Sequence, residues 1–525
     1  MKDKKSLYDN EHNPVAGIDL GTTYSCIARW DGRNSDIYQG LDRIQNKPEI
    51  PSVVYQEQGG NIIVGSVAYN RYLEDPENGV VEIKREMGNT NYRSTMRGKE
   101  YTPAEISSFI LGRIRDEING KFPAGKFSFG GVVVTHPFYF KGPQIDDTRK
   151  AAETAGLNLL GLVPEPVAAA LAYTFVYLKG HLTQDKPETI LVFDLGGGTF
   201  DTTLFEIKET KDRLIFRGLS TSGDAKLGGM DFNHALMDYV LKKEGLNIDA
   251  LTGKERLRAT ALLIQGIDVC KRELADLEKS LLAVPEILPG RHIDREISRD
   301  EFEKVFRGEE GGRNFYDDIR DIVNDTLLKG GYPKIEKVLL VGGSTRIPLI
   351  KERLIPEVVL DAEIYSNISE SLAVAMGATI YAAHLDGRLE YSKEIVIIPP
   401  GYAHDLGIKN NAGKFVTLVK SNAPLPATYS KLFITPEDNC KLLSIEVFER
   451  EGGWPGVLID EGIKEGRIMG VGKIEVNGLP SHRKGEVEIK VRMTVARSDQ
   501  IGVHIEVYYN KEKIKEIDED LKREN

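Results

Sequence analysis

The 525-residue sequence has few cysteines and lacks an apolar run suited to crossing a membrane. Its three cysteines, Cys26, Cys270 and Cys440, lie far apart without a Cys-x-x-Cys pair. We therefore predict neither a disulfide framework nor a zinc site at these cysteines. The longest apolar run, near Val163–Leu178, contains Glu165 and two prolines. A lipid-spanning helix would tolerate these poorly, so we expect a buried helix of a soluble domain.

A concentrated basic segment is also missing. The net charge is −11 and Lys and Arg are scattered along the chain, so we expect no nucleic-acid partner. The first residues carry charges without an apolar core behind them, which does not fit a secretory signal. These absences predict a cytoplasmic protein with no membrane partner. The length predicts roughly three to four compact units.

One pattern occurs twice. VAGIDLGTTYSCIARW spans Val15–Trp30, and ILVFDLGGGTFDTTLF spans Ile190–Phe205. In each, an apolar strand ends in an aspartate, Asp19 or Asp194, and a turn of Gly and Thr leads into a second strand. The pattern predicts two β-hairpins in which the turn is the functional part.

The segments that follow the two hairpins also correspond. A strand-like run at Gly131–Phe140 and a small-residue helix at Glu165–Tyr173 follow the first. A strand and turn at Val338–Pro348 and a helix at Ser371–Ala383 follow the second. This order predicts two related α/β halves that face each other and hold a ligand in the cleft between them.

The pattern changes from about Gly401 onward. Apolar and polar residues alternate over Val487–Val495 and again over Val503–Tyr509, as in half-buried antiparallel strands. We therefore expect a flexible segment at 1–14, a two-lobed α/β domain at 15–389, an apolar linker at 390–400, a β-sandwich at 401–510 and a charged tail at 511–525. We expect that tail to be a frayed helix or disordered.

The turns suggest phosphate binding. Gly-rich turns offer backbone N–H groups with no side chain in the way, as a triphosphate requires. A carboxylate beside a phosphate is repulsive unless a cation lies between them, so the nearby aspartates imply Mg²⁺, bound mostly through water. A single Asp-x-Gly turn is usually an ordinary hairpin, but two in a duplicated architecture favour a nucleotide site. The turn residues are Gly21, Thr22, Thr23, Gly196, Gly197, Gly198 and Thr199, and the aspartates are Asp19, Asp194 and Asp201.

Two further Gly-rich turns, at Gly223–Phe232 and Val341–Pro348, lead into expected helices. Helix N-termini favour anions and ribose hydroxyls through their unpaired N–H groups. Either turn alone would be only a loop.

Five segments, GIDLGTTYS, FDLGGGTFD, GDAKLGGMDF, PEPVAAALAY and VGGSTRIP, resemble the signature segments of the seventy-kilodalton heat-shock protein chaperones of the actin-like ATPase superfamily. The resemblance covers Val15–Asp386 as a nucleotide-binding domain and Gly401–Tyr509 as a peptide-binding β-sandwich. It implies a duplicated actin-like ATPase fold and an ATP-dependent chaperone that holds extended apolar peptides. It also implies ATP or ADP with Mg²⁺ as cofactors and K⁺ as a further candidate ion. A J-domain co-chaperone and a nucleotide exchange factor are the implied partners.

The resemblance also assigns site residues. The catalytic group it implies is Lys84, Glu165, Asp194, Thr199 and Asp201, with Asp19, Asp194 and Asp201 around Mg²⁺. The nucleotide contacts it implies are Gly21, Thr22, Thr23, Tyr24, Gly196, Gly197, Gly198, Gly228, Gly229, Asp268, Lys271, Arg272, Gly342, Gly343, Ser344 and Arg346. Ile408, Phe433, Leu443 and Ile445 align with the family's peptide cleft, although each of them equally fits a sandwich core.

The sequence departs from the family pattern at several positions. Ala275 replaces a serine that touches the adenosine, Asp268 replaces a glutamate, and Met230 replaces another. Ile145 stands where an arginine relays the nucleotide state, and the sequence resembles a lidless form of the family, so we expect weak coupling between the two domains. A nucleotide-gated scaffold with a vestigial ATPase and a small-molecule kinase of the same superfamily are the alternative functions.

Overall fold

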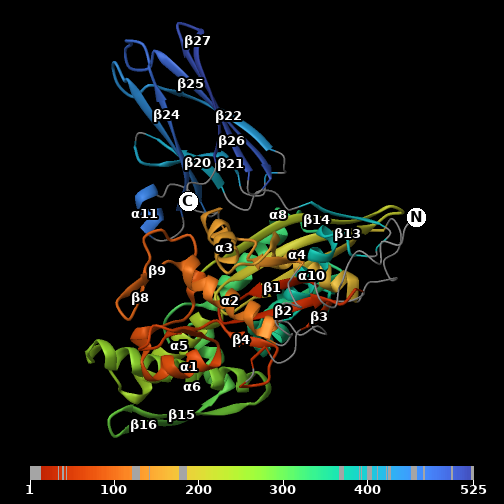
Figure 1. Ribbon diagram of the computed structural model, residues 1–525, viewed down its shortest axis with the longest axis vertical. Helices are drawn as coiled ribbons and strands as arrows, with labels where there is room; N and C mark the ends of the chain where they lie inside the picture. The colour runs from red at the N-terminus through yellow and green to blue at the C-terminus, as the bar shows by residue number, and fades with distance from the viewer. Residues whose placement is uncertain are drawn as a thin grey trace.

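The computed structural model has an α/β part and a β-sandwich that lies at one end of it (Figure 1). The structure describes residues 14–32, 35–37, 41–42, 44–120, 130–140, 142–176, 186–365, 372–389, 391, 393–398, 405–410, 412–420, 423, 427–450, 458–464, 468–497 and 500–521. The expected flexible segment 1–14 lies outside this part except for Pro14.

The first lobe of the α/β part is built on a six-stranded sheet in the order β11-β10-β1-β2-β3, with β4 also paired to β2. Strand β1 is antiparallel to β2 and parallel to β10. The strands are β1 (Val15–Leu20), β2 (Tyr24–Trp30), β3 (Ser35–Ile37), β4 (Glu49–Pro51), β10 (Gly131–His136) and β11 (Leu159–Pro164). Helices α2 (Pro103–Gly120) and α3 (Gly142–Thr154) belong to the same lobe.

The second lobe repeats this plan in the order β18-β17-β12-β13-β14-β19. Strand β12 is antiparallel to β13 and parallel to β17, just as β1 is to β2 and β10. The strands are β12 (Glu188–Leu195), β13 (Phe200–Glu209), β14 (Arg213–Asp224), β17 (Lys337–Val341), β18 (Glu363–Tyr365) and β19 (Glu394–Ile398). The expected fold, a duplicated actin-like α/β domain followed by a β-sandwich, is confirmed.

Two small-residue helices, α4 (Glu165–Val176) and α10 (Ala373–Leu385), pack against each other where the lobes meet. At Gly377 of α10, a Cβ atom would lie 1.7 Å from the carbonyl oxygen of Ala168, so only glycine permits this crossing. Buried residues of both helices and of both sheets, among them Val133 and Val192, form one apolar cluster. Apolar burial therefore holds the two lobes together.

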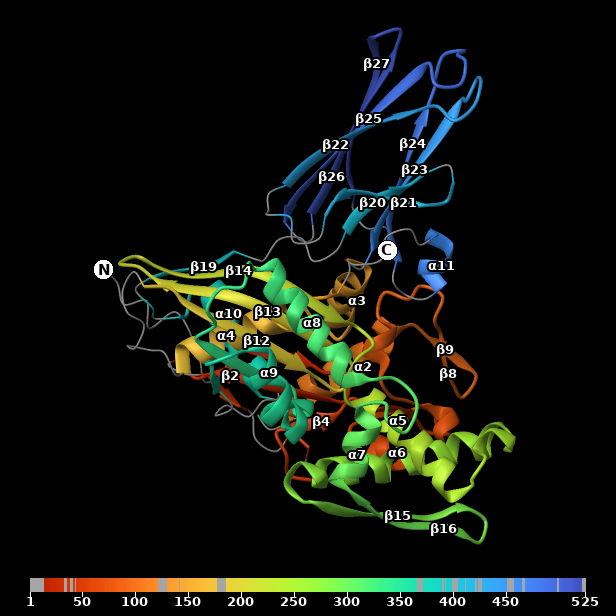
Figure 2. The same cartoon turned by 180° about the vertical axis from the view of Figure 1, so that it is seen from behind.

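A largely helical region extends from the second lobe, at the end farthest from the sandwich (Figures 1 and 2). It contains α5 (Gly229–Glu244), α6 (Gly253–Asp276), α7 (Arg299–Phe306) and the hairpin of β15 (Lys279–Leu288) and β16 (Arg291–Ser298). Helix α8 (Phe315–Lys329) packs instead against β13 and β14 of the second-lobe sheet. The remaining short elements are distributed over the whole α/β part. They are α1 (Ser66–Glu74), α9 (Ile355–Val358), β5 (Val54–Gln56), β6 (Ile62–Val64), β7 (Gly79–Val80), β8 (Ser94–Met96), β9 (Lys99–Tyr101), η2 (Pro76–Asn78), η3 (Ile83–Glu86), η4 (Ile248–Ala250), η5 (Gly343–Arg346) and η6 (Leu349–Leu354).

The sandwich consists of two four-stranded antiparallel sheets, β21-β20-β23-β24 and β22-β25-β26-β27. Alternate residues of both sheets are buried between them, as the period-2 pattern predicts. The elements are β20 (Asp405–Lys409), β21 (Phe415–Val419), β22 (Ala427–Ile434), β23 (Leu442–Arg450), α11 (Ile459–Lys464), β24 (Ile468–Asn477), β25 (Val487–Arg497), β26 (Gln500–Tyr509) and β27 (Glu512–Leu521).

The expectation of a frayed helix or disorder in the charged tail is wrong for Glu512–Leu521. This segment is strand β27, which pairs antiparallel with β26. Ile517 and Leu521 pack against the sandwich core, while most of the charged residues face solvent. Charged side chains on an edge strand discourage pairing with another chain, which explains the high charge of this segment.

The segment expected to be a linker contains β19, which pairs in parallel with β14 at the edge of the second-lobe sheet. The sandwich contacts the first lobe through β24 and α3, and the buried Glu449 accepts a hydrogen bond from the Gly142 N–H at 3.0 Å. Ile145 of α3 packs with Met87 and Phe140 inside the α/β domain.

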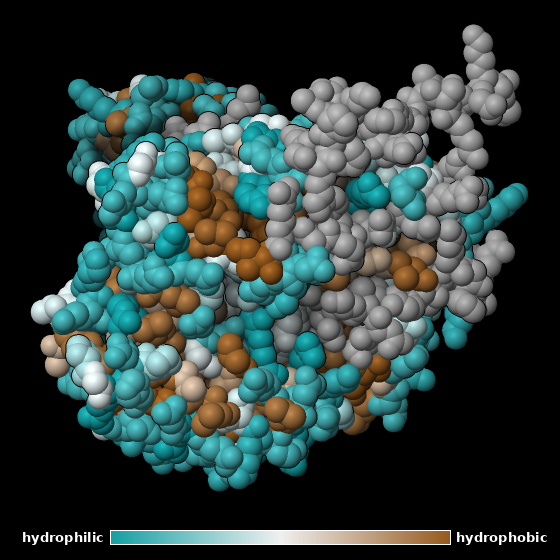
Figure 3. All heavy atoms as spheres, turned by 60° about the horizontal axis from the view of Figure 1, so that its bottom comes forward, coloured by the Kyte–Doolittle hydropathy of each residue, from teal (hydrophilic) through white to brown (hydrophobic). Residues whose placement is uncertain are grey.

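The surface shown in Figure 3 is mainly hydrophilic, with apolar residues gathered in separate patches. Within the described residues, no helix combines the length and the apolarity that a membrane span requires.

Candidate active site

The turns of the two hairpins meet at the centre of the α/β domain. At Gly197, a Cβ atom would lie 2.0 Å from Oγ1 of Thr23, so the second turn can touch the first only with glycine at this position. In the second hairpin, Asp194 is paired directly opposite Asp201, and in the first, Asp19 is opposite Cys26. The duplicated architecture thus brings acids at the ends of two pairs of strands to one place.

A cavity of about 300 Å³ lies between the lobes at this point. The predicted residues that line it are Asp19, Gly21, Thr22, Thr23, Tyr24, Lys84, Glu165, Asp194, Gly196, Gly197, Thr199, Gly229, Asp268, Lys271, Arg272, Gly342, Gly343, Ser344 and Arg346. Cys26, Glu49, Met230, Ala275, Val341, Ile347 and Val374 line it as well. The structure therefore brings residues from distant parts of the chain into one cavity.

Three predicted residues, Gly198, Gly228 and Asp201, lie behind this lining. Gly228 supports the second phosphate turn, because a Cβ atom there would lie 2.6 Å from the Gly198 N atom. Asp201 is almost fully buried and lies opposite Asp194 on the neighbouring strand. The two glycines shape the wall of the cavity, and Asp201 adds a second buried carboxylate next to Asp194.

A buried ion pair stands in the cavity wall. Lys84, in the short helix η3, donates a hydrogen bond from Nζ to Oε1 of Glu165 at 2.6 Å. Glu165 is the first residue of α4, where the helix dipole favours a carboxylate. Both side chains are more than nine-tenths buried, so water screens the pair little.

Burial controls the protonation of this pair. It raises the pKa of Glu165 to about 7, against the opposing effect of Lys84. Burial alone would lower the pKa of Lys84, but Glu165 and Asp19 outweigh it and the pKa is raised. Lys84 therefore remains an ammonium at neutral pH, whereas Glu165 lies near its midpoint and can take up or release a proton.

The three aspartates are poised for a cation. Burial, followed by repulsion from Glu165 and Asp201, raises the pKa of Asp194 well above its usual range. Burial also raises the pKa of Asp201 strongly, and it raises that of Asp19, which accepts a hydrogen bond from Thr135 Oγ1 at 2.8 Å. Within the described residues, no donor reaches the buried Oδ2 of Asp194. A divalent cation would supply the missing positive charge, so these residues fit Mg²⁺ held largely through water.

Arg272 and Tyr24, which both line the cavity, form a cation–aromatic pair. Arg272 of α6 lies over the ring of Tyr24 at 4.9 Å and donates a hydrogen bond to its hydroxyl at 2.8 Å. Asp268 pairs with Arg272 at 2.7 Å and with Lys271 at 3.3 Å. This group joins the helical region to the first hairpin across the cleft. The planar guanidinium can stack on a nucleobase as it does on an aromatic ring.

Hydrogen bonds to backbone carbonyl oxygens connect the second phosphate turn to the turns at Gly228–Gly229 and Gly342–Arg346. Ser344 Oγ and the Gly229 N–H both donate hydrogen bonds to the carbonyl oxygen of Gly196, at 2.9 and 3.0 Å. Lys271 Nζ donates to the carbonyl oxygen of Gly229 at 2.9 Å. The Gly196 N–H is used within the turn, where it donates to the carbonyl oxygen of Thr199 at 3.0 Å. These bonds fix the second turn, and the N–H groups at its tip, those of Gly197 and Gly198, are the ones that a phosphate could use.

Arg85 belongs to the site but was not predicted. Its guanidinium donates to the carbonyl oxygen of Gly198 at 3.0 Å and forms an ion pair with Asp231 at the start of α5. Arg85 thereby links the first lobe to the second phosphate turn. Its position next to Lys84 in the sequence was the one available signal.

The four residues aligned with a peptide cleft all belong to the sandwich interior. Ile408 and Ile445 are 4% and 5% exposed and lie in its core cluster. Phe433 and Leu443 are partly buried and pack against the same cluster. In this structure, all four contribute to the packing of the two sheets.

The chain matches a family model over residues 15–524, which is nearly its whole length. That model describes the Hsp70 protein family, whose members are chaperone-type ATPases. The match extends over both lobes, the hairpin turns, β19 and the sandwich. On this evidence, together with the duplicated lobes and the cavity between them, the chain belongs to the Hsp70 family.

Proposed function

We propose that this chain is an ATP-dependent chaperone that binds and hydrolyses ATP in the central cavity and holds extended apolar peptides with its β-sandwich. One observation carries the ATPase part of the proposal. The buried Lys84–Glu165 pair shares a cavity with the unsatisfied carboxylate of Asp194, between two Gly-rich turns in contact.

Each group has a task in phosphoryl transfer to water, which depends on positioning and charge neutralisation. The N–H groups of Gly197 and Gly198 and those of the first turn would hold the phosphates. The Lys84 ammonium would neutralise charge that develops on the γ-phosphate, and Glu165 could accept the proton of the attacking water at Oε1. Mg²⁺, when bound, supplies further positive charge against the phosphate oxygens. Asp19, Asp194 and Asp201 would hold it.

Family membership supports the peptide-holding part, since Hsp70 proteins generally bind peptides and co-chaperones. In this structure the sandwich is anchored to α3 by the Glu449–Gly142 contact, and β19 is part of the second-lobe sheet. These two connections are the routes by which a movement of the lobes would reach the sandwich, and we expect their effect on peptide affinity to stay below about tenfold. Exposed apolar residues on the edge strand β22, among them Leu432 and Ile434, offer a surface for an extended peptide.

A scaffold with a vestigial ATPase is the second candidate, and Ala275 favours it. This residue lines the cavity near Arg272 and has no hydroxyl with which to contact an adenosine. A lost hydrogen bond of this kind weakens binding by about 1 kcal/mol.

ATP turnover measured with and without a Leu-rich heptapeptide separates the two candidates. A chaperone hydrolyses ATP and changes its rate when peptide binds. A scaffold binds ATP without turnover above that of a variant in which Lys84 is replaced by Ala. Phosphoryl transfer to a small acceptor instead of water would contradict both and indicate a kinase.

A further inference from the structure

The outer face of the last two strands carries an unusual group of charged residues. His504 of β26 lies directly opposite Asp518 of β27, and Glu506 lies directly opposite Glu516. The alternate residues Val503, Ile505 and Val507 of the same strand are buried in the sandwich. The side chains of His504 and Glu506 therefore share the outward face of the sheet. Two carboxylates directly opposite each other repel, and Lys513, with Nζ 2.6 Å from Glu516 and 3.8 Å from Glu506, offsets part of this repulsion.

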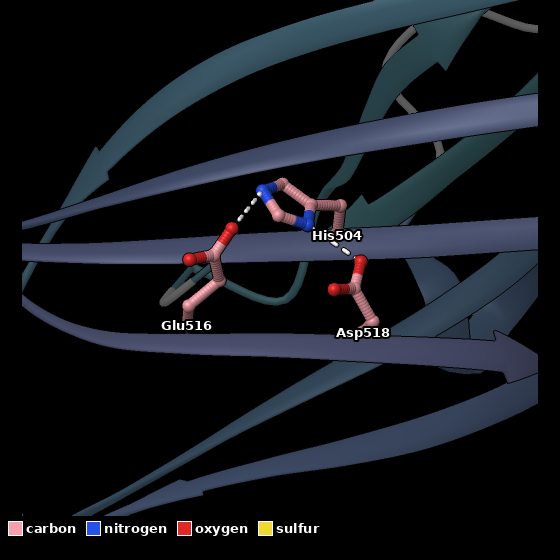
Figure 4. A group of neighbouring side chains, drawn as sticks. All are labelled: His504, Glu516 and Asp518. Carbon is pink, nitrogen blue, oxygen red and sulfur yellow. Dashed lines mark hydrogen bonds and ion pairs between the residues drawn. The ribbon is translucent and has the colours of Figure 1, made fainter.

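Carboxylate oxygens of Glu516 and Asp518 lie on either side of the His504 imidazole (Figure 4). His504 Nδ1 lies 2.6 Å from Oδ1 of Asp518. Nε2 lies 3.2 Å from Oε1 of Glu516 and 3.9 Å from Oε1 of Glu506. Nδ1 of His504 therefore lies next to the Asp518 carboxylate, and Nε2 lies near the carboxylates of Glu516 and Glu506.

The second oxygens of both glutamates are already occupied. Oε2 of Glu516 pairs with Lys513 at 2.6 Å, and Oε2 of Glu506 pairs with Lys490 at 3.2 Å. The lysines thus hold both carboxylates so that Oε1 points toward the imidazole. Lys513 also lies 3.8 Å from Oε1 of Glu506, which completes the network.

We propose that His504 Nε2, Glu516 Oε1 and Glu506 Oε1 form a binding site for a divalent transition metal ion of the zinc type, with water as a fourth ligand. An imidazole with carboxylates is a ligand set that zinc accepts, and three protein ligands with water is a usual arrangement. Tetrahedral bonds of about 2.0–2.1 Å place neighbouring ligand atoms about 3.3 Å apart, close to the distance between Nε2 and Glu516 Oε1.

Asp518 is the orienting residue of this site. Donation of a hydrogen bond from Nδ1 to Asp518 fixes the tautomer that leaves the Nε2 lone pair free for a metal. The two lysines orient the glutamates in the same way. Because the ligands come from both strands, the metal would fasten the charged edge strand β27 to β26.

Calorimetric titration of the full chain, saturated with Mg-ADP, with Zn²⁺ tests the proposal. Besides any zinc bound by the nucleotide, we expect one site, at which binding becomes at least thirtyfold weaker in His504→Ala and in Glu516→Gln. Asp518→Asn should weaken binding about tenfold or more. The control His292→Ala removes an exposed imidazole outside the group and should bind as the wild type does. Zinc bound by the nucleotide contributes equally to every variant.

Equal stoichiometry and affinities within threefold in the wild type and His504→Ala would overturn the proposal. Co²⁺ provides a check that needs no variant, because tetrahedral Co²⁺ has visible absorption bands far stronger than those of the hydrated ion. Strong bands that Zn²⁺ displaces would support the site, and the spectrum of hydrated Co²⁺ alone would overturn it. Metal-dependent slowing of amide exchange in β27 is the expected structural consequence.

Discussion

Replacement of Lys84 by Ala removes the ammonium that contacts Glu165 in the cavity. In the wild type, Nζ lies 2.6 Å from Glu165 Oε1, and both side chains are more than nine-tenths buried. Removal of one partner of such a buried pair usually costs about 3–5 kcal/mol. Glu165 has a pKa of about 7 even with Lys84 present, so in the variant it takes up a proton and avoids most of that cost.

The variant should therefore fold and retain ATP binding, because the turns that hold the phosphates are unchanged. Hydrolysis should fall by about two or more orders of magnitude, since removal of one preorganised electrostatic group costs about 10²–10³ in rate. Single-turnover hydrolysis of labelled ATP measures the rate, and a fluorescent nucleotide measures binding. Lys334→Ala, which removes an exposed lysine, is the matched control. A Lys84→Ala rate within threefold of the wild type would refute the assigned role.

Three further predictions concern the framework around the site. Ile445→Ala should destabilise the sandwich by about 2–5 kcal/mol in urea unfolding, since Ile445 is 5% exposed in the core; a change under about 0.5 kcal/mol with lost peptide binding would instead indicate an open cleft. Burial would raise the pKa of Glu301, but hydrogen bonds from Ser298 and Tyr239 outweigh it and lower the pKa from 4.5 to about 2. The ionised Glu301 therefore stabilises the fold above pH 4.5, and this contribution is lost as the pH falls toward 2. The stability of Glu301→Gln should accordingly trail the wild type at pH 7 and approach it between pH 4.5 and 2, and a gap that stays constant with pH would contradict this. Glu449→Ala should speed amide exchange at the start of α3, because the Gly142 N–H loses its acceptor, and peptide affinity should still differ less than about tenfold between ATP and ADP; exchange equal to the wild type would contradict the anchoring role.

The sequence predicts the two hairpins well because their signal is local. Each strand, its terminal aspartate and its Gly-rich turn are contiguous, so the local pattern alone places Asp19 and Asp194 at strand ends. Arg85 could not be found in this way. Its partners, Gly198 and Asp231, are more than a hundred residues away, and only the packing of the lobes brings them together.

Alternation along a strand shows which residues share a face but not what covers that face. Ile408 and Ile445 fit both a peptide cleft and a sandwich core, and the structure places them between the sheets. For strand β27 the sequence predicts a frayed helix or disorder, which is wrong. Most residues of this strand are charged, so Ile517 and Leu521, which pack on the core, do not stand out as an alternating apolar pattern. Its strand conformation depends on pairing with β26, which a local pattern does not reveal.

Phosphate release from Mg-ATP by the wild type and by Asp194→Asn tests the central claim most directly. The asparagine keeps the shape of the buried side chain but removes the charge that would hold the cation. Our account predicts wild-type turnover at least tenfold above that of the variant, with ATP bound at the same cavity in both. Equal turnover in the two proteins, or no turnover in either, would contradict it.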